Sequence, residues 1–130
     1  MIEIMENDFS IDEAVKRAKQ ENVGAVVIFL GIVRNDGIIS MELESYREAA
    51  ILELGSIRDE AMNKFGLKTA DIFHRVGRLS VGDNIVLIVC SAPHRNEAFN
   101  GCSFILEELK VRVPIWKKEI LEDGTRWVGL

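Results

Sequence analysis

The sequence is poor in the residues that mark special classes of protein. It has two cysteines and two prolines among 130 residues, and Cys90 and Cys102 match neither a CxxC pair nor a metal-ligand spacing. We therefore expect two reduced, buried thiols in a protein of the cytoplasm, with no metal site. No repeat, low-complexity tract or proline-rich linker divides the chain, so residues 1–130 are expected to form one domain.

Long apolar runs and an excess of positive charge are also missing. No apolar stretch approaches the roughly 20 residues that span a membrane, and the first residues, MIEIMENDFSIDEA, are acidic, unlike the start of a signal peptide. The formal net charge is −5, so general binding to nucleic acid or to an acidic membrane is not expected. Any anion must be recognised by a local group of basic residues.

The first half of the chain predicts two helices and two strands. Ser10 and Glu13 form a capping box that begins a helix reaching about residue 20. The run GAVVIFLGIV, residues 24–33, is continuously apolar and predicts a strand buried on both faces. The remaining elements are a strand in MELESY (41–46) and a helix over 46–65, with a second capping box at Ser45 and Glu48 and a C-terminal Gly66.

The second half predicts paired strands around one long helix. The expected elements are a strand in TADIFHRVG (69–77), a turn at 82–83, a strand over 85–90, a helix over 96–113 with an apolar stripe of Phe99, Cys102, Leu106, Leu109 and Val113, and closing strands in PIWKKEIL and TRWVGL around a turn at 123–124. Because strands come in adjacent pairs, we expect an α+β, α/β-hammerhead-like domain. Its sheet should be mixed but mainly antiparallel, with the helices packed on one side.

A basic pair follows the strand over 85–90. Ser91 is a candidate N-cap, and Pro93 suits the first helical position. His94 and Arg95 then lie in the first turn of a helix, where free N–H groups and the helix dipole favour an anion over basic side chains. The pair therefore indicates an anion site built from imidazole, guanidinium and backbone donors, with a solvated basic loop as the alternative.

Further charged residues border apolar segments. Lys110 lies beside the apolar stripe of the last helix, and Lys117 follows in the next strand. An exposed lysine with its stem on the core is the simple interpretation of each, but two lysines against an apolar wall would have lowered pKa values suited to proton transfer or covalent amine chemistry. Arg34 ends the first long strand and is a candidate for a cleft. His74 and Arg75 lie within a strand pattern and are interpreted as structural, with Arg75 a weak site candidate.

Six stretches of the chain resemble, in order, the large, catalytic subunit of molybdopterin synthase. They are FLGIVRN (29–35), ESYREAA (44–50), HRVGRLSVGD (74–83), SAPHRNEAF (91–99), LKVRVPIWKKE (109–119) and RWV (126–128). SAPHR followed about twenty residues later by PIWKKE is the specific part. The resemblance implies a sulfurtransferase of molybdenum cofactor biosynthesis, which converts cyclic pyranopterin monophosphate (precursor Z) to molybdopterin.

The resemblance also implies partners. Two sulfurs are delivered as a thiocarboxylate on the C-terminal Gly-Gly of a small ubiquitin-like subunit, whose tail enters a pocket of the large subunit. Two large subunits form a homodimer within a heterotetramer, and each site draws residues from both of them. The reaction needs no metal or other cofactor, because molybdenum enters later.

Matching positions carry the expected roles. Lys117 and Lys110 are the catalytic residues: Lys117 transfers a proton, and Lys110 stabilises negative charge near the thiocarboxylate. The substrate-binding residues implied by the match are His94, Arg95, Arg34, Val33, Ile32, Lys118 and Glu119. Ile32 stands where many members carry a polar residue, so only its backbone is expected to contribute.

Two other functions are compatible with parts of the pattern. A non-catalytic domain that binds phosphorylated metabolites would use His94, Arg95 and Arg34 but would need no lysine beside its ligand. A persulfide carrier would use Cys90 or Cys102, but the apolar surroundings of both thiols disfavour a reactive thiolate.

Overall fold

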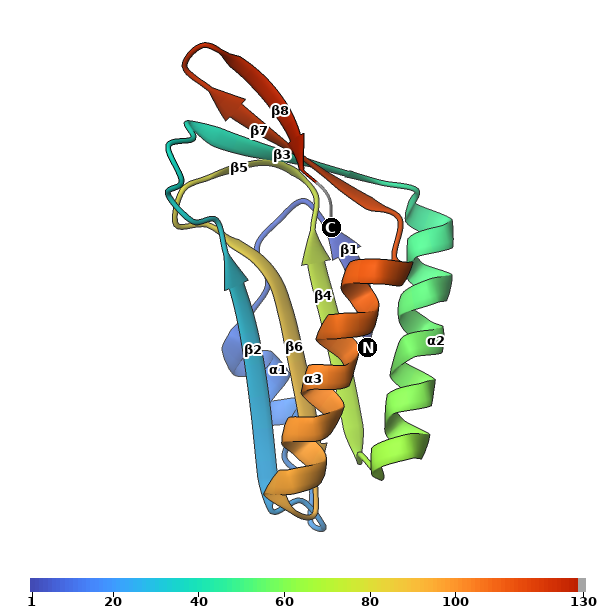
Figure 1. Cartoon of the computed structure of the whole chain (residues 1–130). Coiled ribbons are helices and arrows are strands. Elements are labelled where there is room, and N and C mark those ends of the chain that lie inside the picture. Colours follow the sequence, from blue (N-terminus) through green and yellow to red (C-terminus); the bar gives the residue numbers. More distant parts are fainter. Residues whose placement is uncertain (129–130) are drawn as a thin grey trace.

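Two four-stranded sheets and three helices make up the part of the chain, residues 1–128, that the computed structural model describes (Figure 1). In chain order the elements are β1 (Ile2–Met5), α1 (Ile11–Ala18), β2 (Ala25–Ile32), β3 (Ser40–Ser45), α2 (Arg47–Phe65), β4 (Thr69–Arg75), β5 (Gly77–Ser80), β6 (Asn84–Ala92), α3 (Arg95–Arg112), β7 (Ile115–Leu121) and β8 (Gly124–Val128). The strand expected in TRWVGL is present to Val128, and its last two positions lie outside the described residues.

The strands form a mixed, mainly antiparallel arrangement, as predicted. The first sheet has the order β1-β4-β6-β2, in which only the β1–β4 pair is parallel. The second sheet, β5-β3-β7-β8, is antiparallel throughout. The division into two sheets was not predicted. The sequence pattern of residues 69–77 predicted a single strand. In the structure Gly77, with φ of 92°, turns the chain out of β4 and into β5, which belongs to the second sheet.

Helices cover both faces of the first sheet, so the expectation that they lie on one side was wrong. The helices α2 and α3 pack together on one face, and α1 lies on the other (Figure 1). Phe73 and Leu87 point to α1, whereas Ile72 and Ile88 belong to the core beneath α2 and α3. Successive residues of β4 and β6 are apolar, and alternate residues of a strand face opposite sides, so both faces require cover.

The strand β2 is less buried than its sequence predicts. It lies at the edge of the first sheet and pairs only with β6. Ile28 is 42% exposed and Ile32 is 50% exposed. The expectation of burial on both faces is therefore wrong for the single chain, because an edge strand has a neighbour on one side only.

Of the three helix-end features predicted for α1 and α2, the structure confirms two and contradicts one. The Ser10 hydroxyl accepts a hydrogen bond from the Glu13 N–H at 3.2 Å, which confirms the first capping box. The second is wrong: Ser45 remains in β3, and Tyr46 precedes α2 without a side-chain cap. Gly66 ends α2 in the left-handed conformation, as expected, with φ of 66°.

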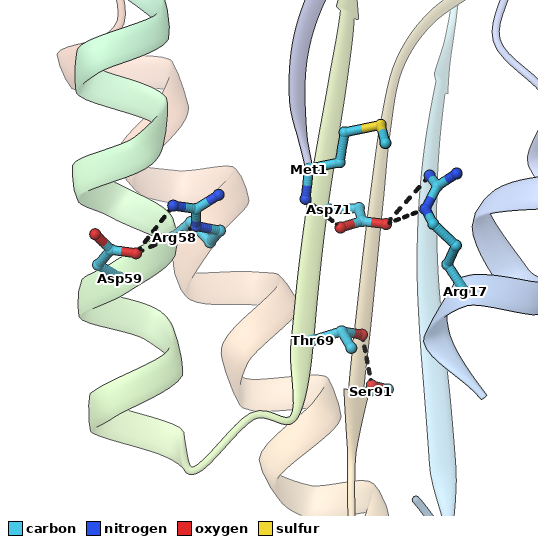
Figure 2. A network of polar contacts seen from close by, with 7 residues as sticks. All are labelled: Met1, Arg17, Arg58, Asp59, Thr69, Asp71 and Ser91. Carbon is cyan, nitrogen blue, oxygen red and sulfur yellow. Dashed lines mark hydrogen bonds and ion pairs between the residues drawn. The ribbon is translucent and has the colours of Figure 1, made fainter. Parts of the chain in front are cut away.

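The predicted start of the last helix also required correction. Ser91 is not its cap, because it lies in β6 and its hydroxyl bonds Thr69 Oγ1 at 2.6 Å (Figure 2). His94 takes the N-cap position and α3 begins at Arg95. The apolar stripe was wrong at Phe99, which is 60% exposed.

A buried carboxylate ties the amino terminus to the first sheet. Asp71 in β4 accepts from the α-amino group of Met1 at 2.5 Å and from the Arg17 guanidinium of α1 at 3.3 and 3.4 Å (Figure 2). Asp71 is only 7% exposed, and a buried charge left without partners destabilises a fold strongly. The network therefore holds β1 and α1 to the same strand.

Candidate functional site

Two lysines line one cavity where the first sheet, α3 and β7 meet. Lys110 lies in the last turn of α3 and Lys117 in β7, and Pro114 between them ends the helix so that the chain returns as a strand. The cavity has a volume of about 160 Å³. Ile32 and His74 also line it, together with apolar side chains of β2, β6 and α3.

The pKa of Lys117 is lowered in this cavity. Burial is the main cause, because it penalises the charged ammonium, and the positive charge of Lys110 adds to it. The carboxylate of Glu119 opposes both effects. An amine with a lowered pKa gives up and takes back a proton at a pH nearer neutrality, as acid–base chemistry requires.

A second hollow adjoins the lysine cavity and shares Lys117 and Ile32 with it. Arg34, Asp36 and Glu119 also line this hollow. The Arg34 side chain is 83% exposed and its Nε lies 3.0 Å from Asp36 Oδ2. Its guanidinium is therefore open to solvent in the hollow that Lys117 also lines.

The two residues expected beside Arg34 and Lys117 are placed differently. Val33 is buried, and its N–H donates to the Asp83 carbonyl at 2.9 Å while its own carbonyl accepts from Gly82 at 2.8 Å. Its N–H is therefore already used in the fold. Lys118 faces away from the cavity, with Nζ 3.7 Å from a Glu42 oxygen.

Glu119 shares the face of Lys117 but has a partner. It is only 7% exposed and accepts from Arg126 Nε at 2.8 Å. A second hydrogen bond comes from the other end of the same guanidinium. The negative charge of the carboxylate is thus balanced by the guanidinium of Arg126 in β8, and part of the carboxylate's capacity to accept hydrogen bonds is used.

His94 and Arg95 border a different hollow at the opposite end of α3. It is lined by both residues, by Gly24 and Pro93, and by Asn96 and Glu97. The His94 side chain is 80% exposed, with Nδ1 3.8 Å from a Glu97 oxygen. His94 makes no side-chain capping bond, so its imidazole is not used to end the helix.

A close backbone approach fixes the segment that carries this pair. The Gly24 N–H donates to the Ala92 carbonyl at 3.0 Å. A Cβ atom at Gly24 would lie 2.3 Å from the Pro93 carbonyl oxygen, a steric clash that glycine avoids because it has no side chain. The start of β2 therefore sets where His94 is presented.

One chain does not bring all the predicted site residues together. Sixteen positions of α3 and its cap separate His94 from Lys110, which corresponds to about 24 Å along a helix. The structure unites Lys110, Lys117 and Ile32, with Arg34 and Glu119 adjoining them. It leaves His94 and Arg95 in a second, remote group.

His74 is a cavity residue that the sequence reasoning interpreted as structural. It lines the same cavity as both lysines, is 2% exposed, and has Nδ1 2.8 Å from the Arg75 carbonyl oxygen. Burial, reinforced by the charge of Lys117, lowers its pKa to about 4 against the opposing effect of the Arg75 carbonyl. The clue in the sequence was period-2 alternation, which puts His74 on the face of the buried Ile72. Arg75 itself is structural, donating to the carbonyls of Glu6 and Asn84.

We expect His74 to make stability fall in mild acid. The folded pKa of about 4 lies below the ordinary 6.5, so the unfolded chain takes up the proton first as pH falls. The contribution is complete above pH 6.5 and is lost on the way to pH 4, a decrease of about 3 kcal/mol in the free energy of unfolding. Urea unfolding at pH 7 and pH 4, at one protein concentration, should show a smaller decrease for His74→Asn than for the wild type. Equal decreases would contradict the prediction.

The two thiols offer no reactive centre. Cys90 and Cys102 are both free and buried. A hydrogen bond with Cys102, together with burial, raises the pKa of the Cys90 thiol far above its ordinary range, and the same hydrogen bond lowers the pKa of Cys102 against the opposing effect of burial. Both side chains are also shielded from solvent, Cys90 at 0% and Cys102 at 5% exposure, so neither thiol is accessible to a sulfur donor and the persulfide-carrier hypothesis has no support here.

Two further classes of site are absent from the described part of the chain. Within residues 1–128, no helix is long and apolar enough to cross a membrane. The same residues contain no group of three or more His, Cys, Asp or Glu side chains placed to hold a metal ion.

Comparisons with known proteins agree on one family. A family model described as MoaE protein matches residues 4–112. The chain is 43% identical over 125 residues to the molybdopterin synthase catalytic subunit of Pyrococcus abyssi (strain GE5 / Orsay), an alignment covering 93% of this chain and 84% of that protein. The crystal structure of molybdopterin synthase from Staphylococcus aureus aligns with a TM-score of 0.92 at 37% identity, covering 98% of this chain and 96% of the other.

The fold is shared beyond close sequence similarity. A protein–protein complex of subunits 1 and 2 of molybdopterin-converting factor from Helicobacter pylori 26695 contains a chain that aligns with a TM-score of 0.82. The two sequences are 23% identical, and the alignment covers 98% of this chain and 89% of that one. The mixed α+β architecture is thus confirmed by solved structures.

Proposed function

The chain belongs to the MoaE family, and from this premise we propose that it is the catalytic subunit of a molybdopterin synthase. In this role it converts precursor Z to molybdopterin by placing two sulfurs on the pterin, a sulfurtransferase reaction of molybdenum cofactor biosynthesis. The observation that carries the proposal is the pair Lys110 and Lys117 in one largely apolar cavity, where the pKa of Lys117 is lowered. We take residues 1–130 as one domain acting in the cytoplasm, where buried cysteines stay reduced.

The sulfur donor in this proposal is a small ubiquitin-like subunit that ends in a Gly-Gly thiocarboxylate. The Pyrococcus relative is named a catalytic subunit, and the Helicobacter structure is a complex of two subunits. A cavity of about 160 Å³ with apolar walls suits a tail without side chains. The ammonium of Lys110, which lines the cavity, would stabilise the negative charge of the thiocarboxylate.

Lys117 has the role of moving protons at the reacting carbon atoms. Lys117 lines both the cavity of Lys110 and the Arg34 hollow, so one amine is available to a ligand that occupies either space. The exposed guanidinium of Arg34 offers a bidentate contact to an anionic group of the pterin. The residues described here supply charge and proton transfer, and the proposed reaction draws on no metal or other cofactor.

His94 and Arg95 complete the site from a second copy of the chain. They lie about 24 Å along α3 from Lys110, too far for one pterin phosphate to contact both groups in a single chain. A two-fold dimer places the same surface of each copy against the other, which allows the start of one α3 to meet the lysines of its partner. The exposed apolar side chains Ile28 and Ile32 on the unpaired edge of β2 support self-association.

Reconstitution tests the proposed function. The purified chain is mixed with precursor Z and with a thiocarboxylated small subunit, and the dithiolene product is measured. We expect product only in the complete mixture, and a complete mixture without product would refute the proposal. The alternative of a regulatory phosphometabolite domain has no observation in its favour, and calorimetry that showed nucleotide binding without binding of the small subunit would support it.

A further inference from the structure

His74 occupies a place in the lysine cavity that the proposed chemistry has not yet used. Its ring lies at the end of β4, almost completely buried, against the same space as the two lysines. Nδ1 is 2.8 Å from the Arg75 carbonyl oxygen. A carbonyl oxygen only accepts hydrogen bonds, so Nδ1 carries the hydrogen and the neutral ring keeps a lone pair on Nε2.

A neutral hydrogen-bond acceptor suits this cavity because two lysines already place positive charge in it and the nearby carboxylate of Glu119 is paired with Arg126. The ionisable groups around Lys117 are Lys110 from α3, Glu119 from β7 with Arg126 from β8, and Arg34 with Asp36 from the segment after β2, whereas β3 places the apolar Leu43 opposite Lys117. Glu119 is partly occupied by Arg126. An imidazolium would add a third positive charge beside the lysines, whereas a neutral imidazole offers Lys117 an acceptor without changing the net charge.

Resting on the function proposed above, we propose that His74 is a positioning residue for Lys117. Its Nε2 accepts a hydrogen bond from the Lys117 ammonium through one water in the cavity that both residues line, and so orients Nζ toward the bound pterin. The cavity volume of about 160 Å³ accommodates such a water beside a ligand group. The Arg75 carbonyl sets the tautomer, as a carbonyl or carboxylate commonly does for histidines that serve a neighbouring group.

Two isosteric variants separate this role from simple packing. His74→Asn keeps an N–H where Nδ1 stood and removes the acceptor, whereas His74→Gln returns an oxygen near the position of Nε2. We expect His74→Asn to lower turnover about tenfold to a hundredfold, the effect of losing a hydrogen bond to a charged group. His74→Gln should recover most of the loss. Thermal unfolding of both variants shows whether they are folded under the assay conditions.

The pKa of Lys117, measured by NMR of its Nζ in the isolated chain, reports the same contact without any turnover. Removing an acceptor from the ammonium favours the neutral amine, so this pKa should fall by about one pH unit in His74→Asn. It should return in His74→Gln, and the limb of the turnover profile that depends on Lys117 should shift to lower pH in parallel. An unchanged Lys117 pKa in His74→Asn would overturn the proposal.

The wild-type chain supplies a test that needs no variant to fold. The ring nitrogens of His74 should show the neutral form with hydrogen on Nδ1 at pH 7. Hydrogen on Nε2 would remove the acceptor and overturn the proposal. Failure of these tests would leave reconstituted sulfur transfer intact, whereas failure of reconstitution would leave the measured tautomer and lysine pKa unaffected, so the two proposals are distinguishable.

Discussion

Lys117→Ala should lose about a thousandfold in turnover while still binding the small subunit, because a positioned acid–base group contributes on that order. The side chain lies inside the cavity rather than on the outer surface, and its neighbours in the sheet, Leu43 and Val128, pair through backbone that the change leaves in place. Turnover is measured in the reconstituted system, and binding of the small subunit by calorimetry. Near-normal turnover would remove Lys117 from the mechanism.

Two companion variants define what Lys117 contributes. Lys117→Arg keeps the positive charge but replaces the amine with a guanidinium that does not release its proton. It should be almost as inactive as Lys117→Ala, and strong rescue by arginine would show that charge alone is needed. Lys16→Ala removes a lysine from the exposed side of α1 and should leave turnover unchanged.

Mixed dimers should regain activity from two inactive parents. One parent carries Lys117→Ala, and the other carries His94→Ala with Arg95→Ala. If each site takes its lysines from one copy and its basic pair from the other, a dimer with one copy of each parent contains one intact site and one doubly damaged site. Random pairing makes half of all dimers mixed, so the mixture should recover about a quarter of wild-type turnover.

The same experiment tells whether the site is shared at all. A site contained within one chain would have no intact copy in any mixed dimer, and the mixture would then stay as inactive as its parents. The parents must first be separated into monomers and allowed to pair again, and light scattering shows whether pairing has occurred. The separation of about 24 Å along α3 is the physical reason to expect recovery.

Local sequence patterns predicted most of the elements. The bond from Glu13 N–H to Ser10 and the left-handed Gly66 follow from chemistry within a few residues, and so they were visible in the sequence. The misplaced capping box at Ser45 shows the limit of such patterns. Ser45 satisfies the motif, but its backbone is paired with Ile115 in the second sheet, and that long-range pairing takes precedence over the cap.

The candidate site was likewise predictable from the sequence only in its local features. The sequence by itself determined the kinds of group available, a basic pair at a helix start and lysines on either side of Pro114, because residue chemistry and spacing along one or two elements are local properties. Only the tertiary structure decided which groups share a space. It brought His74 from β4 into the cavity of Lys110 and Lys117 and left His94 a helix length away, because contacts between elements depend on strand order and helix packing, which local periodicity does not specify.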